Sequence, residues 1–376
     1  MATFDPHPIV MWELTRACDL HCSHCVSGAG ERRDPNELTT YEAYKAIDQI
    51  VALKPRELVI TGGDPLRRSD LEQLVDYARR SGLEPAVVVS PSSLLTTDAI
   101  GGLQRFGLTR MIFSIDGSTP EIHQTAHGVT GTFAATLHAM YAAKSAGMTV
   151  EVNTLVTRQN VDDLLDIVNL LRPLSISRWN VHFLVPVGGA IGVDSITAAE
   201  AERTFARLTD ISINESFDVR VTEAPQYRRF RIQRELRERL VGAAAAAETW
   251  PDFTDYESDN SVEPGRLETI DGARNFVYIS HAGDVRASEF LPQSAGNIRY
   301  RSLGTIYRRS DLFVALRDPS TLSGNCGRCE YRHSCGGSRA RAWALTGDVF
   351  ASDPLCAYEP GSEILATVRH SSEASA

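Results

Sequence analysis

The chain has 376 residues, which at about 150 residues per domain predicts two to three domains. It contains 38 Lys and Arg against 48 Asp and Glu, and this net charge of −10 argues against a broad basic surface for nucleic acid or anionic lipid. Its 43% hydrophobic and 23% charged residues exclude a wholly disordered protein. No segment approaches the ~20 apolar residues that span a bilayer, and no basic-then-apolar leader opens the chain. We therefore expect a cytoplasmic protein with no membrane contact.

The first half of the chain alternates short apolar runs with longer helical stretches. The runs are rich in Val and Ile, as expected for parallel strands that are covered on both faces. The predicted strands are Ile9–Thr15, Glu57–Thr61, Pro85–Ser90, Arg110–Ile115, Thr149–Val156 and Arg178–Val185. The predicted helices between them are Thr39–Leu53, Leu71–Arg80, Gly131–Ala146 and Val161–Leu171. This succession predicts an α/β fold with a parallel sheet, open or curled into a partial (β/α)6 TIM-like barrel, and active groups at the carboxyl ends of the strands.

After Val185 the strand–helix rhythm breaks. We predict helices over Thr197–Leu208 and Tyr227–Leu240, a helix end at Ala243–Ala247, an exposed acidic loop over Asp252–Glu263, and a hairpin of Phe276–Ser280 with Val285–Ala287. The expected organisation is a barrel over residues 1–215, a bridging segment over 216–274, a small α+β domain over 275–360 and a disordered tail over 361–376.

Seven cysteines lie in two groups, namely Cys18, Cys22 and Cys25, then Cys326, Cys329, Cys335 and Cys356. An odd count in two tight groups is unlike a disulfide framework and indicates metal ligation. Three thiolates within eight residues can bind three corners of a [4Fe–4S] cluster and leave the fourth iron open. Because His21 and His24 are interleaved with these cysteines, structural zinc is an open alternative.

Three other strand ends carry motifs that match this first cysteine group. They are Gly62-Gly63-Asp64-Pro65 after the second strand, Ser114-Ile115-Asp116-Gly117 after the fourth, and Asn153 on the fifth. With Cys18-x3-Cys22-x2-Cys25 and His24 just before the third cysteine, the chain resembles the radical SAM superfamily. The resemblance implies that Gly62, Gly63 and Asp64 hold the amino group of S-adenosylmethionine (SAM), and that Ser114 and Asp116 lie near its ribose and carboxylate. It also implies reductive cleavage of SAM to a 5′-deoxyadenosyl radical, and a reductant such as flavodoxin or ferredoxin.

Each of these motifs also has a simpler structural interpretation. Gly62-Gly63 and Asp116-Gly117 are typical of turns, and Asp64 could cap the next helix, although Ser69 is the better N-cap. Where the family has His-Asp-x-x-Arg after its Ser-x-Asp-Gly motif, this chain has His123-Gln124-Thr125-Ala126-His127. No arginine contact is therefore carried over.

The second cysteine group has the spacing Cys326-x2-Cys329-x5-Cys335, followed by Cys356. By itself it fits a zinc ribbon or a second [4Fe–4S] cluster equally well, and thiols that bind no metal are a third alternative. Its setting resembles the SPASM extension of radical SAM enzymes, and Cys335–Ala342 resembles SPASM proteins of haem biosynthesis and mycofactocin-type maturases. Two cysteines of the family's first auxiliary cluster are replaced by Ser288 and Arg339. The resemblance therefore implies one auxiliary cluster bound by four cysteines, for electron transfer, structural support or sulfur donation.

The substrate has the weakest signature in the sequence. No peptide-recognition domain precedes Cys18, so we expect a small molecule or cofactor such as a tetrapyrrole, nucleoside or sugar. Modification of a ribosomally made peptide is the alternative, and an iron–sulfur electron carrier or zinc-binding protein is a remote one. The candidate pocket residues are His182, Phe183, Glu223, Tyr227, Arg228 and Glu289.

Two of these pocket candidates are predicted to be catalytic. Glu289 is a candidate general base and Tyr227 a candidate proton or radical relay. The simpler interpretations are a solvated glutamate in a hairpin and a tyrosine packed in the core. Arg228 and Arg229 could clamp a carboxylate or phosphate, although an Arg/Glu-rich surface helix accounts for them more simply.

Overall fold

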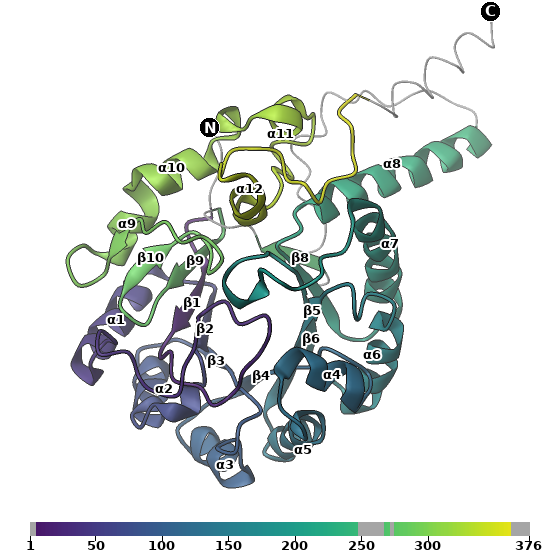
Figure 1. Cartoon of the computed structure of the whole chain (residues 1–376). Helices are drawn as coiled ribbons and strands as arrows, with labels where there is room; N and C mark the ends of the chain where they lie inside the picture. Colours follow the sequence, from purple (N-terminus) through teal and green to yellow (C-terminus); the bar gives the residue numbers. More distant parts are fainter. Residues whose placement is uncertain (1–4, 247–266, 271–273, 362–376) are drawn as a thin grey trace, which may run out of the picture.

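The structure, a computed structural model, describes residues 5–246, 267–270 and 274–361. Eight strands lie side by side in chain order and parallel to one another, which confirms the α/β fold with a parallel sheet (Figure 1). They are β1 (Ile9–Glu13), β2 (Glu57–Thr61), β3 (Pro85–Val88), β4 (Arg110–Ser114), β5 (Thr149–Val156), β6 (Arg178–Phe183), β7 (Asp218–Thr222) and β8 (Leu267–Ile270). All six predicted strands are present. β7 and β8 were not predicted, and both lie in the segment expected to be a bridge.

Helices cover the outer face of the sheet (Figure 1). They are α1 (Thr40–Leu53), α2 (Leu71–Arg80), α3 (Thr97–Arg105), α4 (Pro120–His127), α5 (Thr132–Ser145), α6 (Leu164–Leu171), α7 (Ala198–Asn214) and α8 (Gln226–Ala246). A capping box formed by Thr39 and Glu42 begins α1. α3 and α4 were missed because Gly101 and Gly102 weaken the pattern of α3, whereas α4 is short and polar.

The predicted hairpin is present, but it joins the barrel sheet. β9 (Phe276–Ile279) runs parallel to β1, β10 (Asp284–Arg286) is antiparallel to β9, and β11 (Gly296–Asn297) completes the edge. The eleven strands therefore form one sheet in the order β11-β10-β9-β1 and on through β8. This sheet continues across both expected domain boundaries, at residues 215 and 274. The division into domains therefore stays a prediction.

Short helices joined by loops form the rest of the tail and lie over the same side of the barrel as β9 (Figure 1). Its helices are α9 (Leu303–Arg309), α10 (Asp311–Arg317), α11 (Gly324–Arg328) and α12 (Arg339–Thr346). Short 3₁₀ turns occur at η1 (Pro65–Arg67), η2 (Arg172–Leu174), η3 (Gly188–Ala190) and η5 (Pro319–Thr321). The predicted loop Asp252–Glu263, Ala247 and residues 362–376 of the predicted tail lie outside the described residues.

Buried charges fill the amino-terminal end of the barrel. Glu57 at the start of β2 lies 2.9 Å from both Arg110 and Arg220 and 3.4 Å from Arg178. Glu151 of β5 lies 3.4 Å from Arg178 and 3.5 Å from Arg110. Above this network, Ile9, Val59 and Ile112 pack inside the barrel, so any site must open at the other end of the strands.

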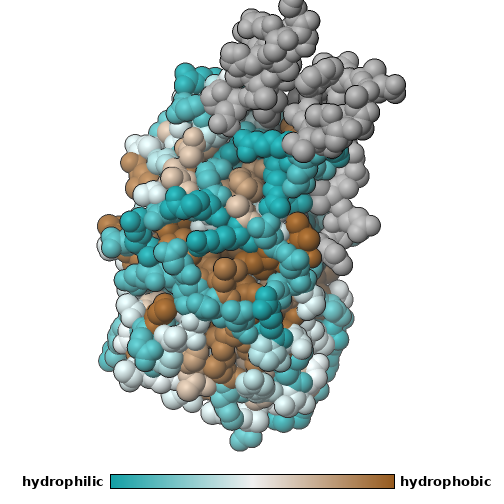
Figure 2. All heavy atoms as spheres, turned by 90° about the vertical axis from the view of Figure 1, so that its right-hand side faces the viewer, coloured by the Kyte–Doolittle hydropathy of each residue, from teal (hydrophilic) through white to brown (hydrophobic). Residues whose placement is uncertain are grey.

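The outer helices present a mixed surface. On the face that lies at the right of Figure 1, hydrophobic areas are surrounded by hydrophilic side chains (Figure 2). α6 and α7 form part of this side and carry the exposed Leu165 and Ile213. Within the described part of the chain, no helix has the length and apolar character needed to cross a membrane.

Candidate active site

A cavity of about 320 Å³ lies at the carboxyl ends of the strands. It brings together predicted residues from the first cysteine group and from the ends of β2, β4, β5 and β6, together with one from the tail. The predicted residues that line it are Cys18, Cys22, His24, Cys25, Gly62, Gly63, Ser114, Asp116, Asn153, His182 and Glu289. Segments from both ends of the chain therefore meet at one site.

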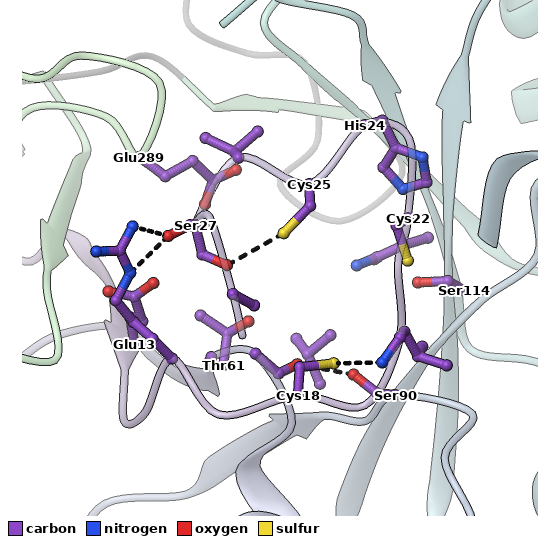
Figure 3. Close-up of a pocket in the computed structure, with 18 of the residues that line it drawn as sticks. Glu13, Cys18, Cys22, His24, Cys25, Ser27, Thr61, Ser90, Ser114 and Glu289 are labelled. Atoms are coloured by element: carbon purple, nitrogen blue, oxygen red, sulfur yellow. Dashed lines mark hydrogen bonds between the residues drawn. The ribbon is translucent and has the colours of Figure 1, made fainter. Parts of the chain in front are cut away.

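The three cysteines lie on the long loop between β1 and α1 and surround the cavity (Figure 3). The Cys18 N–H donates to the carbonyl of Gly30, and the Leu20 N–H donates to Cys18 Sγ at 3.4 Å. Burial raises the pKa of the Cys18 thiol. Among the described residues, no three His, Cys, Asp or Glu side chains are positioned to share a single metal ion. A [4Fe–4S] cluster does not require this, because each cysteine binds a separate iron.

The turn after β2 packs on the backbone of this loop. The Gly63 N–H donates to the carbonyl of Thr15, and the Asp64 N–H donates to the carbonyl of Ala17, both at 2.7 Å. A Cβ atom on Gly63 would lie 2.6 Å from the Ala17 carbonyl oxygen, so only glycine fits there.

Asp64 itself is fully buried and faces away from the cavity. Its carboxylate accepts hydrogen bonds from the Ser92 hydroxyl at 2.6 Å and from the Leu66 N–H, and so caps η1. The N-cap of α2 is Asp70, whereas Ser69 was expected. Asp64 therefore supports the turn, and the structure gives its side chain no direct access to a ligand.

Asp116 is held rigidly at the end of β4. Its Oδ1 accepts from the Leu155 N–H at 2.7 Å, and its carbonyl accepts from Asn160 Nδ2 at 2.9 Å. Although burial opposes ionisation, the neighbouring His127 holds the pKa of Asp116 well below its usual range. Asp116 is therefore a fixed anion beside Ser114 and Asn153 at the floor of the cavity.

His127 occupies the position at which the family pattern has arginine. Its Nε2 lies 3.1 Å from Asp116 Oδ2, and its Nδ1 lies 3.5 Å from Cys22 Sγ. Burial opposes its charge, but Asp116 and the Cys22 thiol together raise the pKa of His127 to about 10. A cationic imidazole thus replaces the guanidinium. The ring of His24 lies 5.8 Å from that of His127, and burial lowers the pKa of His24.

The opposite wall comes from β1 and the β9–β10 hairpin, and most of it was not predicted. Glu13 and Glu289 lie on the side of the cavity away from Cys22 and Ser114 (Figure 3). Glu13 Oε2 is 2.6 Å from His281 Nδ1, and Tyr278 and Arg286 complete the wall. Burial, with the carboxylates of Glu223 and Glu13 nearby, raises the pKa of Glu289 to about 8. Glu289 is therefore a mainly protonated acid at neutral pH.

Tyr227 does not line the cavity. Its side chain is fully buried, packs 5.5 Å from the ring of Phe205 and has its hydroxyl 3.2 Å from Thr209 Oγ1. The structure therefore gives the predicted relay role no support, and Tyr227 is a core residue. Phe183 is likewise buried in the core.

Two other pocket candidates serve the packing of the tail on the barrel. Glu223 has a left-handed backbone (φ 55°) and accepts hydrogen bonds from Ser288 and Ser338. Arg228 donates to the carbonyl of Ser334. Of the remaining candidates, His182 does line the cavity, and burial lowers its pKa to about 4, so that it is neutral.

The four cysteines of the second group line a smaller cavity of about 50 Å³ in the tail. The Gly337 N–H donates to Cys335 Sγ at 3.4 Å, and Arg339 Nη2 lies 3.7 Å from Cys326 Sγ. Burial raises the pKa of the Cys335 and Cys356 thiols. N–H donors and a guanidinium around four sulfurs suit a thiolate-bound cluster, whose net negative charge they offset.

Comparison with known proteins agrees with this geometry. The model of the radical SAM superfamily matches residues 12–171. A relative from Oleidesulfovibrio alaskensis described as an AdoMet-dependent heme synthase is 35% identical over 94% of this chain and 87% of its own length. A Fe-coproporphyrin III synthase of Methanosarcina barkeri is 29% identical over 94% and 88%, and a PqqA peptide cyclase of Bradyrhizobium diazoefficiens is 27% identical over 96% and 89%.

The fold also matches a solved structure. The structure of Streptococcus suis SuiB bound to S-adenosylmethionine superposes with a TM-score of 0.69 over 94% of this chain and 77% of that one. The sequence identity is 16%, so this likeness concerns the fold alone.

The packing of Gly63 on Ala17 generates a test. Gly63→Ala forces the turn and the cysteine loop apart, and overpacking of this kind costs about 1–3 kcal/mol. We expect the variant to bind SAM about tenfold or more weakly and to lose iron from the first site. Gly30→Ala is the matched control, because no atom lies within 4 Å of its added Cβ. Iron analysis and equilibrium SAM binding measure both, and equal values for the two variants would contradict the packing argument.

Proposed function

The chain belongs to the radical SAM superfamily, and we propose that within it this enzyme acts on an iron tetrapyrrole in haem formation. The observation that carries the proposal is the 35% identity with a heme synthase over almost the full length of both chains. A further relative forms another iron tetrapyrrole. Both relatives fit the tetrapyrrole, which is one of the substrate classes expected from the sequence.

We propose that Cys18, Cys22 and Cys25 bind the [4Fe–4S] cluster of the superfamily, and that SAM lies between it and the strand ends. When bound, the cluster supplies the electron that cleaves SAM and so generates a hydrogen-abstracting radical. Gly62 and Gly63 allow the backbone to approach the ligand closely, and Ser114, Asp116 and Asn153 orient its polar groups. His24 and Leu155 help to exclude water from the cavity that they line.

We propose that Cys326, Cys329, Cys335 and Cys356 bind a second [4Fe–4S] cluster. This proposal is supported by the position of the four thiols, which line one small cavity together with amide and guanidinium donors. A cluster closed by four thiolates has no open iron for substrate, which favours electron transfer or a structural role. Arg339, which stands at one cysteine position of the family's other auxiliary cluster, donates to Cys326 here.

We propose Glu289 as the general acid or base of the reaction. It lies on the wall opposite Cys22 (Figure 3), and with a pKa of about 8 it can hold or release a proton near neutral pH. A soluble reductant such as flavodoxin or ferredoxin would supply electrons, and the acidic net charge of −10 gives no reason to expect nucleic acid as a partner. A cytoplasmic location is part of this proposal.

Modification of a peptide is the second candidate function. It is favoured by the peptide cyclase that matches 96% of this chain and 89% of its own length at 27% identity.

The function is tested by turnover. Reconstituted protein with SAM and a low-potential reductant should convert Fe-coproporphyrin III to a product of changed mass and release 5′-deoxyadenosine in step with it. If a short precursor peptide is encoded beside this gene, that peptide is the comparison substrate. Turnover of the peptide with none of the tetrapyrrole would overturn the proposal in favour of the second candidate.

The two cluster sites are tested separately. The reconstituted protein should contain about eight iron atoms, as two [4Fe–4S] clusters require. Joint replacement of Cys18, Cys22 and Cys25 by Ala should remove about four of them and all SAM cleavage, yet leave the absorption of the second cluster. Cys335→Ala should instead keep the SAM-binding cluster. Zinc in place of iron at either group would contradict its assignment.

The raised pKa of Glu289 has a consequence for stability. Burial keeps Glu289 protonated in the folded protein up to about pH 8, whereas its ordinary value is 4.5. The unfolded chain therefore loses this proton first, and the folded state loses stability as the pH rises through this window. Glu289→Gln removes the effect. The Tm of this variant should equal that of the parent protein near pH 4.5 and exceed it at about pH 8 and above.

Thermal unfolding across this pH range measures the difference. Glu84→Gln, at an exposed ion pair with Arg79, is the control and should follow the parent protein. A constant offset between Glu289→Gln and the parent at all pH values would show that Glu289 ionises normally.

A further inference from the structure

The β9–β10 hairpin turns two polar side chains toward the cavity. In the antiparallel pair, Arg286 lies opposite Tyr278 and Val285 lies opposite Ile279. Directly opposed residues share one face of a sheet, and successive residues alternate between the faces. Val285 and Ile279 belong to the core outside the barrel, whereas Tyr278 packs with the interior residues. Arg286 therefore faces the interior, and it lines the cavity next to Tyr278.

Arg286 is half-buried and differs in its pairing from the buried arginines of the fold. Arg68 pairs with Asp70 at 2.7 Å, Arg220 with Glu57 at 2.9 Å and Arg341 with Asp353 at 3.2 Å. The Nε atom of Arg286 is shielded from solvent and has no hydrogen-bond partner among the described residues, where no carboxylate pairs with its guanidinium either. A half-buried guanidinium with a shielded N–H that has no acceptor is unfavourable in a folded protein, so the position of Arg286 is explained if a ligand supplies the acceptor.

The acidic groups of the same wall have partners of their own. Glu13 is bound by His281, whose other nitrogen lies 3.5 Å from Asp34. Glu223 accepts from two serine hydroxyls. Burial and the neighbouring Glu13 carboxylate, to which the Tyr278 hydroxyl is hydrogen-bonded, raise the pKa of Tyr278 well above its usual value. Burial keeps Glu289 mainly protonated, so that it presents an O–H donor. The wall thus offers one cation and one neutral donor to whatever enters.

We propose that Arg286 anchors a carboxylate of the substrate, on the wall opposite Cys22. A guanidinium binds a carboxylate through two parallel hydrogen bonds, which fixes the orientation of the bound group as well as its position. A substrate held there by its acid end extends its carbon chain across the cavity toward the SAM pocket. The tetrapyrrole as substrate rests on the proposed function, whereas the carboxylate anchor rests on the hairpin geometry.

The experiment compares binding of an acid with binding of its ester. Holoprotein with SAM is titrated with Fe-coproporphyrin III and with its tetramethyl ester, followed by absorption. Arg286→Gln should weaken binding of the acid about tenfold or more, as expected for loss of a charged hydrogen bond. The ester should bind the parent protein and Arg286→Gln equally. Arg308→Gln, at an exposed arginine of α9, is the matched control and should bind the acid like the parent.

A second measurement separates an anchor from a structural residue. Without substrate, Arg286→Gln should unfold at the same temperature as the parent protein or above it, because it removes a half-buried charge with which no described carboxylate pairs. An unfolding temperature several degrees lower, together with unchanged binding of the acid, would overturn the anchor.

A third measurement keeps the anchor testable if the tetrapyrrole is wrong. If the parent protein binds neither the acid nor the ester, the proposed function fails. Labelling of Arg286 by phenylglyoxal, read by mass spectrometry, is then compared in propionate and in propionamide. Protection by propionate alone supports the anchor, and equal labelling in both overturns it.

Discussion

The site depends on a backbone-to-backbone contact between the turn after β2 and the loop that follows β1. Two N–H···O bonds join Gly63 and Asp64 to Thr15 and Ala17, with no space for a side chain between them. Cys18 follows Ala17 directly, so this contact fixes the first cysteine relative to the strand ends. Asp64 stabilises the same turn on the side away from the cavity, because its buried carboxylate caps η1 and binds Ser92. A ligand therefore meets a wall made of main chain, whose shape no side-chain rotamer can change.

The charged side chains at the two ends of the barrel differ in how completely they are paired. At the closed end, Glu57 and Glu151 are surrounded by Arg110, Arg178 and Arg220 in a network of paired charges. At the open end, no carboxylate in the described part of the chain pairs with Arg286, and no cation there pairs with Glu289. Proteins accept incomplete pairing of this kind where binding or catalysis needs it. The same fold thus uses ion pairs for stability at one end and leaves groups available at the other.

Local sequence patterns predicted one half of the cavity and missed the other. The cysteines, Gly62, Gly63, Ser114 and Asn153 were found because they resemble the motifs of the radical SAM superfamily and lie at successive strands, whose carboxyl ends meet at one edge of a parallel sheet. Glu13, Tyr278 and Arg286 were missed because they meet only through the pairing of β9 with β1, and a short apolar run does not reveal its partner. Tyr227 and Glu289 show the limit for single residues, since burial places one in the core and the other in the cavity.

The pairing of β9 with β1 also has a consequence for how the protein is made. β1 and the cysteine loop leave the ribosome first, but the strand that covers the edge of β1 comes from residues 276–279. Until then β1 is an exposed sheet edge, which is open to pairing with other chains. The same delay leaves the first cysteine group accessible from the side that the hairpin later closes. Synthesis of the tail therefore sets the time at which the edge of β1 and this side of the barrel are closed.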